Sequence, residues 1–427
     1  MKSLKYWIVS IKNMDLAQIS KFMCMNMKKL ILTLVLTCIG SFNSFGQDSF
    51  KTMFYNLLNF PQQAVPENRI EFLKEILLET QPDIFMVCEL NNEAGADIII
   101  DMIQADVNPD FERATFEFNT SDDDIGNQND LQNLVFFDST KFSLEDEVII
   151  TTLYRDFNHY RFKLNTVDQE MNPMFIDVIV AHLKSSDGGE NQGIRNLMVQ
   201  DLLGYLDTFP QDSHVLLGGD LNLYRSTENA FENLTEITNN ITFVDPAVDG
   251  IGNWHNNDDF IHVFTQSTRT STGMGGATGG LDDRFDFIMT SESMEVSMDN
   301  TDPDLYYVEG SYEIFGNNSN VDCFNQAIIS DQCDVDGDPT TNDYSAEIRE
   351  LLFNFSDHLP VILEIETSQS FLSVPEFSET LKYYEIIRTN VVSNSLHLRT
   401  NNQLLSNKRL HIFNTLGQVV KSWSIEH

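Results

Sequence analysis

Polar side chains that can bind a metal or transfer a proton adjoin six short apolar runs of this sequence. Carboxylate and carbonyl oxygens are the donors that Mg²⁺ and Mn²⁺ prefer, and a histidine beside a carboxylate suits proton transfer. Because strand ends converge in α/β sheets, we expect these side chains to form one site. They are Asn56, Glu89, His182, Asp220 with Asn222, Asp286, and Asp357 with His358.

Each of these residues also has a simpler interpretation when it is taken alone. A glutamate that ends a strand, such as Glu89, is usually solvated, and His182 alone would be a hydrogen-bonded strand-end histidine. The Gly-Gly-Asp-Leu-Asn sequence at 218–222 is more often a turn than a site, whereas Ser-Asp-His-Leu-Pro at 356–360 is a less common string. A functional interpretation therefore depends on the whole ordered set.

Strand and helix patterns alternate through the middle of the chain. The spacing of Leu197, Leu202 and Leu206 places them on the inner face of one helix, and the strand before Gly218 and Gly219 is expected to break there. Mixed elements of this kind predict an α/β or α+β domain with buried sheets. The expected helices are 69–80, 96–103 and 194–206, and the expected strands are 51–56, 84–88, 113–118, 131–137, 161–164, 174–180, 215–217, 285–289 and 361–365.

The charge of the chain is strongly negative and unevenly distributed. The 427 residues include 65 acidic and 26 basic side chains, for a formal net charge of −39, and the stretch 48–370 holds 60 of the acids and 14 of the bases. The composition excludes whole-chain disorder, collagen, a coiled coil and a polytopic membrane protein. It also removes the general electrostatic attraction to nucleic acid, and it suggests a protein that works outside a cytoplasm or in salt.

The N-terminus has the pattern of a secretory signal. Two lysines precede an apolar run at 30–40, and Ser-Phe-Gly at 44–46 places small residues where a signal peptidase reads them. We expect translation to begin at Met25 or Met27, and the run is too short for a stable membrane span. The prediction is a bacterial protein that is secreted or displayed on the cell surface. A buried first helix and a lipoprotein anchored at Cys38 are the alternatives.

The cysteines and one acidic loop have structural interpretations. Cys88 lies in an apolar run and is expected to be a buried strand thiol, while Cys323 and Cys333 flank a polar loop and form a plausible disulfide in an exported protein. No cysteine and histidine pattern indicates zinc. The alternating carboxylates at 334–338 resemble those of calcium loops but lack EF-hand spacing, so a solvated loop is favoured over a Ca²⁺ site.

The order of six motifs resembles the endonuclease/exonuclease/phosphatase superfamily, the fold of deoxyribonuclease I and the exonuclease III-like repair nucleases. The resemblance covers roughly residues 48–368, and it implies a four-layer α/β sandwich with two mixed sheets face to face and helices outside. The motifs are Tyr-Asn-Leu-Leu-Asn-Phe at 55–60, Val-Cys-Glu-Leu at 87–90, Ala-His-Leu-Lys-Ser at 181–185, Gly-Gly-Asp-Leu-Asn at 218–222, Asp-Asp-Arg-Phe-Asp-Phe-Ile at 282–288 and Ser-Asp-His-Leu-Pro-Val at 356–361.

The resemblance also implies roles for the residues of these motifs. Asp220 would orient or deprotonate the attacking water, and His358 would pair with Asp286. Relatives of the deoxyribonuclease type support the histidine equivalent to His182 with a glutamate. Only Asp130 could substitute for it here, and we leave that role unassigned. Glu89 would hold Mg²⁺ or Mn²⁺ with Asn56 and Asp357 nearby, and Asn222 and His182 would contact the phosphate.

The last residues form a second, smaller unit. Alternating apolar and polar residues at 395–399 and 409–420 predict β-strands with a turn at Gly417. They resemble the first part of the C-terminal sorting domain of type IX secretion cargo, which implies the type IX secretion machinery as a partner, and an ordinary small β appendage is the alternative. The expected organisation is a leader at 1–47, a catalytic domain at 48–368, a linker at 369–380 and a partial β-rich sorting domain at 381–427.

These observations favour a secreted, divalent-metal-dependent phosphodiester hydrolase, most readily a nuclease acting on DNA or RNA. The shortage of bases predicts few substrate contacts, with Arg284 and Lys184 as the candidate side chains. A phosphatase or phosphodiesterase acting on sugar phosphates or lipid headgroups is the alternative. A secreted surface protein without enzymatic activity that binds Ca²⁺ is the second alternative.

Overall fold

The computed structural model describes residues 48–63, 65–119, 131–296, 304–334 and 344–372, together with four short strands beyond residue 380. The predicted leader at 1–47, residue Asp130 and most of the acidic loop at 334–338 lie outside the described residues. No helix in the described part is long and apolar enough to cross a membrane. The chain divides into two compact units, Met1–Phe371 and Leu372–His427.

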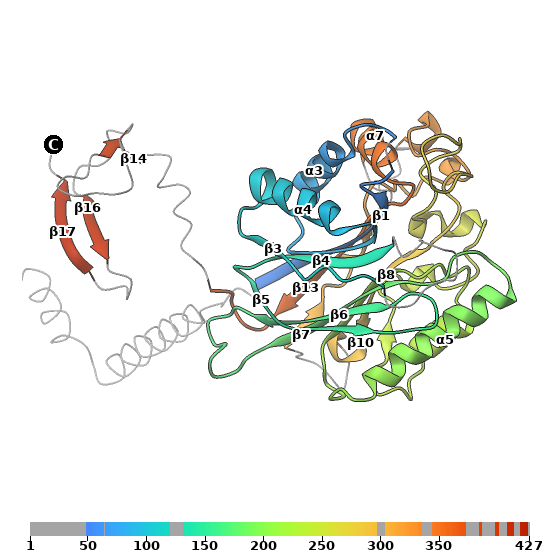
Figure 1. The fold of residues 1–427 in the computed structure, drawn as a ribbon, viewed down its shortest axis with the longest axis horizontal. Coiled ribbons are helices and arrows are strands. Elements are labelled where there is room, and N and C mark those ends of the chain that lie inside the picture. The colour runs from blue at the N-terminus through green and yellow to red at the C-terminus, as the bar shows by residue number, and fades with distance from the viewer. Residues whose placement is uncertain are drawn as a thin grey trace, which may run out of the picture. The chain divides into compact units, whose positions relative to one another are not determined.

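Two mixed β-sheets form the centre of the first unit (Figure 1). In each sheet one central pair is parallel, β1 with β2 and β7 with β8, and the other pairs are antiparallel. The first sheet runs β11-β13-β1-β2-β4-β3, with β12 also on β13: β1 (Asp48–Phe60), β2 (Ile84–Leu90), β3 (Phe111–Arg113), β4 (Gln132–Asp138), β11 (Leu305–Tyr307), β12 (Glu313–Ile314) and β13 (Val361–Thr367). The second runs β5-β6-β7-β8-β10-β9: β5 (Phe142–Ile150), β6 (Phe157–Leu164), β7 (Phe175–His182), β8 (Val215–Asp220), β9 (Phe243–Val244) and β10 (Asp286–Ser291).

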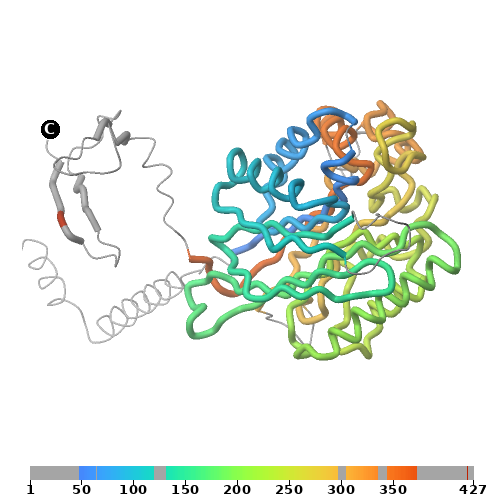
Figure 2. Tube along the Cα trace, viewed as in Figure 1, coloured from blue at the N-terminus to red at the C-terminus, as the bar shows by residue number. Residues whose placement is uncertain are grey.

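Helices cover the outer faces of the two sheets. Figures 1 and 2 show α3, α4 and α7 outside the first sheet and α5 outside the second, which confirms the predicted four-layer α/β architecture. The helices are α3 (Arg69–Thr80), α4 (Glu93–Met102), which continues as a π turn η1 (Ile103–Val107), α5 (Gly189–Leu206), α6 (Asn229–Leu234) and α7 (Ala346–Phe355). Short 3₁₀ turns are η2 (Val248–Gly250), η3 (Asp258–Val263), η4 (Glu292–Met294), η5 (Val321–Cys323) and η6 (Asp331–Cys333).

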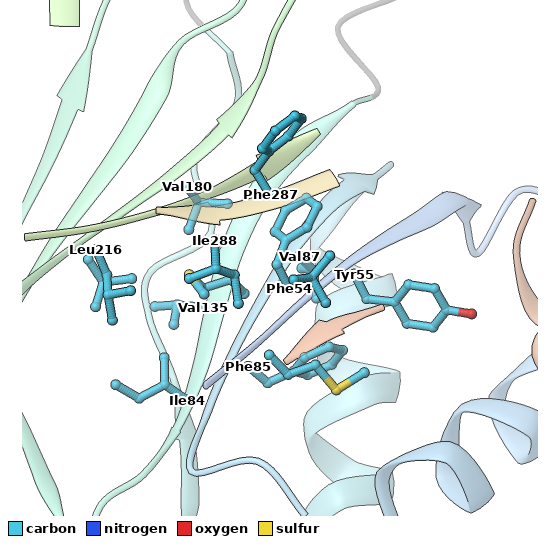
Figure 3. Close-up of a cluster of buried hydrophobic side chains, with 14 of the residues drawn as sticks. Phe54, Tyr55, Ile84, Phe85, Val87, Val135, Val180, Leu216, Phe287 and Ile288 are labelled. Atoms are coloured by element: carbon cyan, nitrogen blue, oxygen red, sulfur yellow. The ribbon is translucent and has the colours of Figure 1, made fainter. Parts of the chain in front are cut away.

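The hydrophobic core lies between the inner faces of the sheets (Figure 3). Phe54 and Val135 come from the first sheet, Val180 and Ile288 come from the second, and all four are fully buried. Burial of side chains of this size contributes about 1.5–3 kcal/mol each relative to leaving them in water. This packing fixes the spacing of the sheets, and therefore of the polar residues at their ends.

The second sheet continues through Gly218 and Gly219, where the sequence predicted a break. A Cβ atom at Gly218 would lie 2.6 Å from the sulfur of Met86 on the facing sheet, and one at Gly219 would lie 2.7 Å from Ala181 on the neighbouring strand. Gly219 is therefore required by the backbone of the neighbouring strand, and Gly218 leaves room for the Met86 side chain, so both glycines are explained by packing rather than by a turn. As a result β8 extends as far as Asp220, which becomes the last residue of a rigid strand.

Two other local predictions were wrong. Leu197 is 47% exposed, because α5 buries Met198 and Val199 instead. The strand expected at 113–118 ends at Arg113, where pairing with β4 stops. The helix error concerns a position at which the apolar spacing fits two faces of α5, and packing against the sheet selects one of them.

A disulfide joins Cys323 to Cys333, with the two Cα atoms 4.4 Å apart. It connects the short turns η5 and η6. Cys88 is a buried free thiol within β2, and burial raises its pKa well above the ordinary value. Because the thiolate is the reactive form, Cys88 is a packing residue.

The second unit contains two antiparallel strand pairs. One pair joins β14 (Tyr384–Ile386) to β15 (Leu398–Thr400), and the other joins β16 (Lys408–Phe413) to β17 (Val419–Ile425). The sequence indicated strands in both regions, and Gly417 lies outside the described residues.

Candidate active site

Three neighbouring strands of the second sheet bring His182, Asp220 and Asp286 together. His182 ends β7 and is in register with Asp220 at the end of the parallel strand β8. Asp286 begins β10 and is in register with Asp220 from the other side, because β10 is antiparallel to β8. The strand register alone therefore places these three side chains in one row, and all three residues are buried.

The first sheet supplies the facing half of the site. Asn56 lies near the end of β1, and its side-chain nitrogen donates to Glu89 Oε1 at 3.2 Å and to Asp220 Oδ2 at 3.0 Å. The backbone N–H of Asn59 donates to the other oxygen of Glu89 at 3.1 Å. His358, just before β13, has its Nδ1 atom 2.7 Å from Asp286 Oδ2. The two sheets thus meet through polar side chains at this edge.

The resulting cluster is tightly packed. His182 Nε2 lies 3.6 Å from Asp220 Oδ2 and 4.0 Å from Glu89 Oε1, and His358 Nε2 lies 3.8 Å from the same Asp220 oxygen. Two overlapping triads each have ligand atoms within 4.8 Å of one another. They are Glu89, His182 and Asp220, and Asp220, Asp286 and His358.

Two residues of the site have left-handed backbone conformations. Glu89 has φ = 55° and Asn222 has φ = 49°. Such values are uncommon for residues with side chains and cost about 1–3 kcal/mol unless the surroundings hold them. Glu89 lies where the pairing of β2 with β4 shifts, between Val87 and Leu90. The N–H of Asn222 donates to Asp220 Oδ1. The bend at Glu89 accompanies its contacts with Asn56 and His182, and the Asn222 side chain donates to the carbonyl of Leu183.

Burial raises the pKa values of two carboxyl groups of the site, Glu89 and Asp220. Burial, and then the Coulombic effect of Asp357, raises the pKa of Glu89. Burial is also the main cause that raises the pKa of Asp220 to about 7, and Asp286 and Glu89 add to it while His358 opposes it. A carboxyl group with a pKa near 7 can accept a proton from water at neutral pH.

The two histidines have opposite charge preferences. Burial, with a smaller effect of Arg155, lowers the pKa of His182 well below its ordinary value, so its ring is neutral. Burial alone would also lower the pKa of His358, but Asp286 and Asp357 outweigh it and hold that pKa well above the ordinary value. His358 and Asp286 are therefore a charged pair, and His182 is a neutral donor or acceptor.

The donor set fits a divalent cation with oxygen ligands. Asp220 is buried, the Glu89 side chain is 15% exposed, and their carboxylate oxygens lie within 4.8 Å of each other. In the described part of the structure, Asp286 Oδ1 and Asp357 Oδ1 are also buried without a hydrogen-bond partner. Carboxylates in excess of donors are typical of a Mg²⁺ or Mn²⁺ site.

Two of the predicted metal ligands are engaged differently from Glu89. Asn56 turns its amide nitrogen to the carboxylates, and its oxygen accepts from the N–H of Leu58. Asp357 Oδ2 accepts from Gln266 Nε2 at 3.0 Å and from the N–H of Ala277 at 2.6 Å. In this arrangement Asn56 orients the carboxylates as a donor, and Asp357 is held at the edge of the cluster.

Arg284 is not a substrate contact, which corrects the sequence prediction. Its guanidinium is fully buried and donates to both oxygens of Asp245, each at 2.7 Å. Lys184 is half-buried, with its ammonium 5.1 Å from the centroid of the Tyr154 ring. Among the described residues, His182 Nδ1 has no hydrogen-bond partner, so its supporting group is unassigned.

Arg155 is a site residue that sequence reasoning missed. It precedes β6, is 8% exposed, and donates to the carbonyl oxygen of Leu183, which also accepts from Asn222. Its charge influences the pKa values of His182 and Glu89. The sequence offered one indication of this role, namely that Arg155 is one of few basic residues in an acidic domain. No motif marked it, because its position depends on how β6 pairs with β7.

No family model and no curated protein matches this sequence. Among solved structures, the human Nocturnin catalytic domain with bound sulfate is 16% identical, with a TM-score of 0.45, covering 76% of this chain and 98% of its own. A humanized D. rerio TDP2 is 14% identical, with a TM-score of 0.44, and the match covers 75% of this chain and 99% of the TDP2 chain. An endonuclease/exonuclease/phosphatase from Bacteroides vulgatus is 12% identical, with a TM-score of 0.46, and the match covers 75% of this chain and 100% of the other chain. The function is therefore inferred from the site itself.

Proposed function

We propose that this chain is a divalent-metal-dependent phosphodiester hydrolase of the endonuclease/exonuclease/phosphatase type. The observation that carries the proposal is the convergence of Glu89, His182, Asp220 and the pair of His358 with Asp286 in one buried cluster. These residues come from five separated motifs, and core packing does not require buried carboxylates and imidazoles at strand ends. The ordered resemblance of the motifs supports the same reaction class.

Each side chain has a chemical task in this proposal. Asp220 accepts a proton from the attacking water, as its pKa of about 7 allows. Asn222 and neutral His182 donate hydrogen bonds to the nonbridging phosphate oxygens. Charged His358, held by Asp286, stabilises the negative charge that grows in the transition state. Arg155 adds a fixed positive charge behind Asn222.

Glu89 would hold the cation, with Asp357 beside it. When bound, Mg²⁺ or Mn²⁺ neutralises charge on the phosphate and acidifies water. Cations matter particularly here, because the catalytic domain has so few basic side chains to offset its own negative field.

We favour a nuclease that acts outside the cell, consistent with the signal-like N-terminus and the acidic composition. Recognition by the type IX secretion machinery is part of this proposal and rests on the motifs near the C-terminus. A phosphatase acting on sugar phosphates or lipid headgroups would use the same cluster. The two are distinguished by assaying the purified full-length chain with Mg²⁺ on plasmid DNA, RNA, a chromogenic diester and a chromogenic monoester. A nuclease cleaves a polymer and the diester, whereas preference for the monoester would reject the nuclease assignment.

The structure also predicts weak salt dependence of nucleic-acid binding. Few bases are available to phosphates, because five arginines are buried in bonds to backbone carbonyls or carboxylates. They are Arg69, Arg195, Arg269, Arg284 and Arg349.

We expect a log–log binding slope that corresponds to fewer than about three phosphate contacts, and cleavage that persists to about 0.5 M NaCl. Added salt screens the repulsion over a Debye length of about 10 Å at 0.1 M. Plasmid binding and cleavage from low salt to 0.5 M, at fixed Mg²⁺, test this. A slope of five or more contacts would show that a basic groove exists.

A further inference from the structure

A second histidine–aspartate pair lies beside the cluster and has no role in the reaction described above. The Nδ1 atom of His255 lies 2.6 Å from Asp283 Oδ1. The His255 side chain is 40% exposed, whereas that of Asp283 is 12% exposed. Thus the carboxylate is at the base of the pair and the imidazole faces outward.

The position of His255 is fixed by the loops that follow the catalytic strands. Its N–H donates to the carbonyl of Tyr224, which lies two residues after Asn222, and its ring packs edge-on against the Tyr224 ring with centroids 4.8 Å apart. Tyr224 packs in turn against Phe285, which precedes Asp286. His255 therefore lies on the rim of the site, held by residues adjacent to Asn222 and Asp286.

The second pair repeats the geometry of the first. Asp283 and Asp286 are three residues apart on the segment that enters β10, and each lies against the Nδ1 atom of one histidine. Gln266 links the two pairs, since its backbone exchanges hydrogen bonds with Asp283 and its side-chain nitrogen lies 2.6 Å from His358 Nε2. In the second pair the Nε2 atom of His255 remains for a ligand, whereas Nε2 of His358 already faces Gln266.

We propose that His255, positioned by Asp283 and Tyr224, binds a second phosphate group of the substrate, next to the phosphate that is cleaved. This inference rests on the proposed function and narrows it to phosphoesters that carry a neighbouring phosphate. With Nδ1 donating to Asp283, a proton on Nε2 makes the ring a cation, which is the form that donates to a phosphate oxygen.

Few of the basic side chains that the structure describes near His255 are free to contact a second phosphate. The rim also contains Arg225, but its guanidinium is already paired with Asp187 at 3.4 Å. The His255 ring, oriented by the Asp283 carboxylate, can donate from Nε2 to a phosphate oxygen. It thereby provides specificity in a domain that has few bases.

The test compares nucleotides with one and with two phosphates. Binding of thymidine 3′,5′-bisphosphate, thymidine 3′-monophosphate and thymidine 5′-monophosphate to the full-length chain is measured by calorimetry with Mg²⁺. We expect the bisphosphate to bind the wild type more tightly than either monophosphate, and His255→Gln to weaken it about tenfold while the affinity of the monophosphate bound at the cluster is unchanged. His255→Arg should restore part of the loss, and His262→Gln, in the turn η3 and outside the pair, is the matched control.

Kinetics give a second readout. For a dinucleotide with an added terminal phosphate, His255→Gln should raise KM without changing kcat, and for the same dinucleotide without that phosphate neither value should change. An equal loss for one and two phosphates, or no loss for either, would overturn the role of His255. Absence of hydrolysis by the wild type would instead reject the proposed function, because the binding comparison does not require turnover.

Discussion

Asp220→Asn should lower kcat for phosphodiester hydrolysis by about 10³-fold or more while the protein remains folded. Asparagine keeps the oxygen that accepts the N–H of Asn222, but it cannot take a proton from water. Burial raises the pKa of Asp220 to about 7 in the folded state, which means that its charge at neutral pH opposes folding. The thermal midpoint of Asp220→Asn should therefore stay close to that of the wild type, because removal of the buried charge offsets the lost hydrogen bond from Asn56 to Oδ2.

The measurement is kcat on a chromogenic diester together with a thermal melt. Asp177→Asn is a matched control, because Asp177 is also buried on a strand of the second sheet but pairs with His159 and Arg161 away from the cluster. That variant should lose stability and keep kcat in its folded fraction. If Asp220→Asn keeps wild-type kcat, Asp220 is not the base.

Asp286→Asn should lower kcat about 10²-fold and move the alkaline limb of the pH–rate profile to lower pH. Asp286 is the main reason why the pKa of His358 lies well above its ordinary value despite burial. With the carboxylate present, His358 stays charged until the pH exceeds that raised pKa. Without the carboxylate, the pKa of His358 falls. The ring then loses its proton at a lower pH, and the rate decreases because the charge on the ring is gone.

The pH dependence of kcat, measured from about pH 5 to 10 for both proteins, tests this pairing. His159→Gln removes a different buried histidine bound to a carboxylate and should leave the shape of the profile unchanged. A profile for Asp286→Asn that is reduced in height but unchanged in position would separate the two residues. His358 would then be a simple phosphate contact.

The local patterns predicted an α/β or α+β domain with buried sheets and the strand-end positions of most cluster residues, whereas the four layers were implied by the resemblance of the ordered motifs. The ends of β2, β7 and β8 follow continuous apolar runs, so that Glu89, His182 and Asp220 could be recognised as strand-end residues. The motifs also have a distinctive order along the chain. What could not be read locally was the register between strands, which places His182, Asp220 and Asp286 in one row.

The errors have a common physical origin in long-range packing. Arg284 resembled a substrate contact because it is a rare base in a motif, but Asp245 neutralises it from 39 residues away. Gly218 resembled a turn because its contact with Met86 crosses from one sheet to the other. Arg155 and His255 were overlooked because only the folded loops bring them to the site.

The central claim is that the cluster hydrolyses phosphodiesters with a divalent cation held by Glu89. The most direct measurement is cleavage of a chromogenic diester by the full-length chain after EDTA treatment, followed by titration with Mg²⁺ or Mn²⁺. We expect no turnover in EDTA, recovery on adding either cation, and a Glu89→Gln variant that needs at least about tenfold more cation for half-maximal recovery. Full activity in EDTA, or a Glu89→Gln titration identical to that of the wild type, would contradict the account.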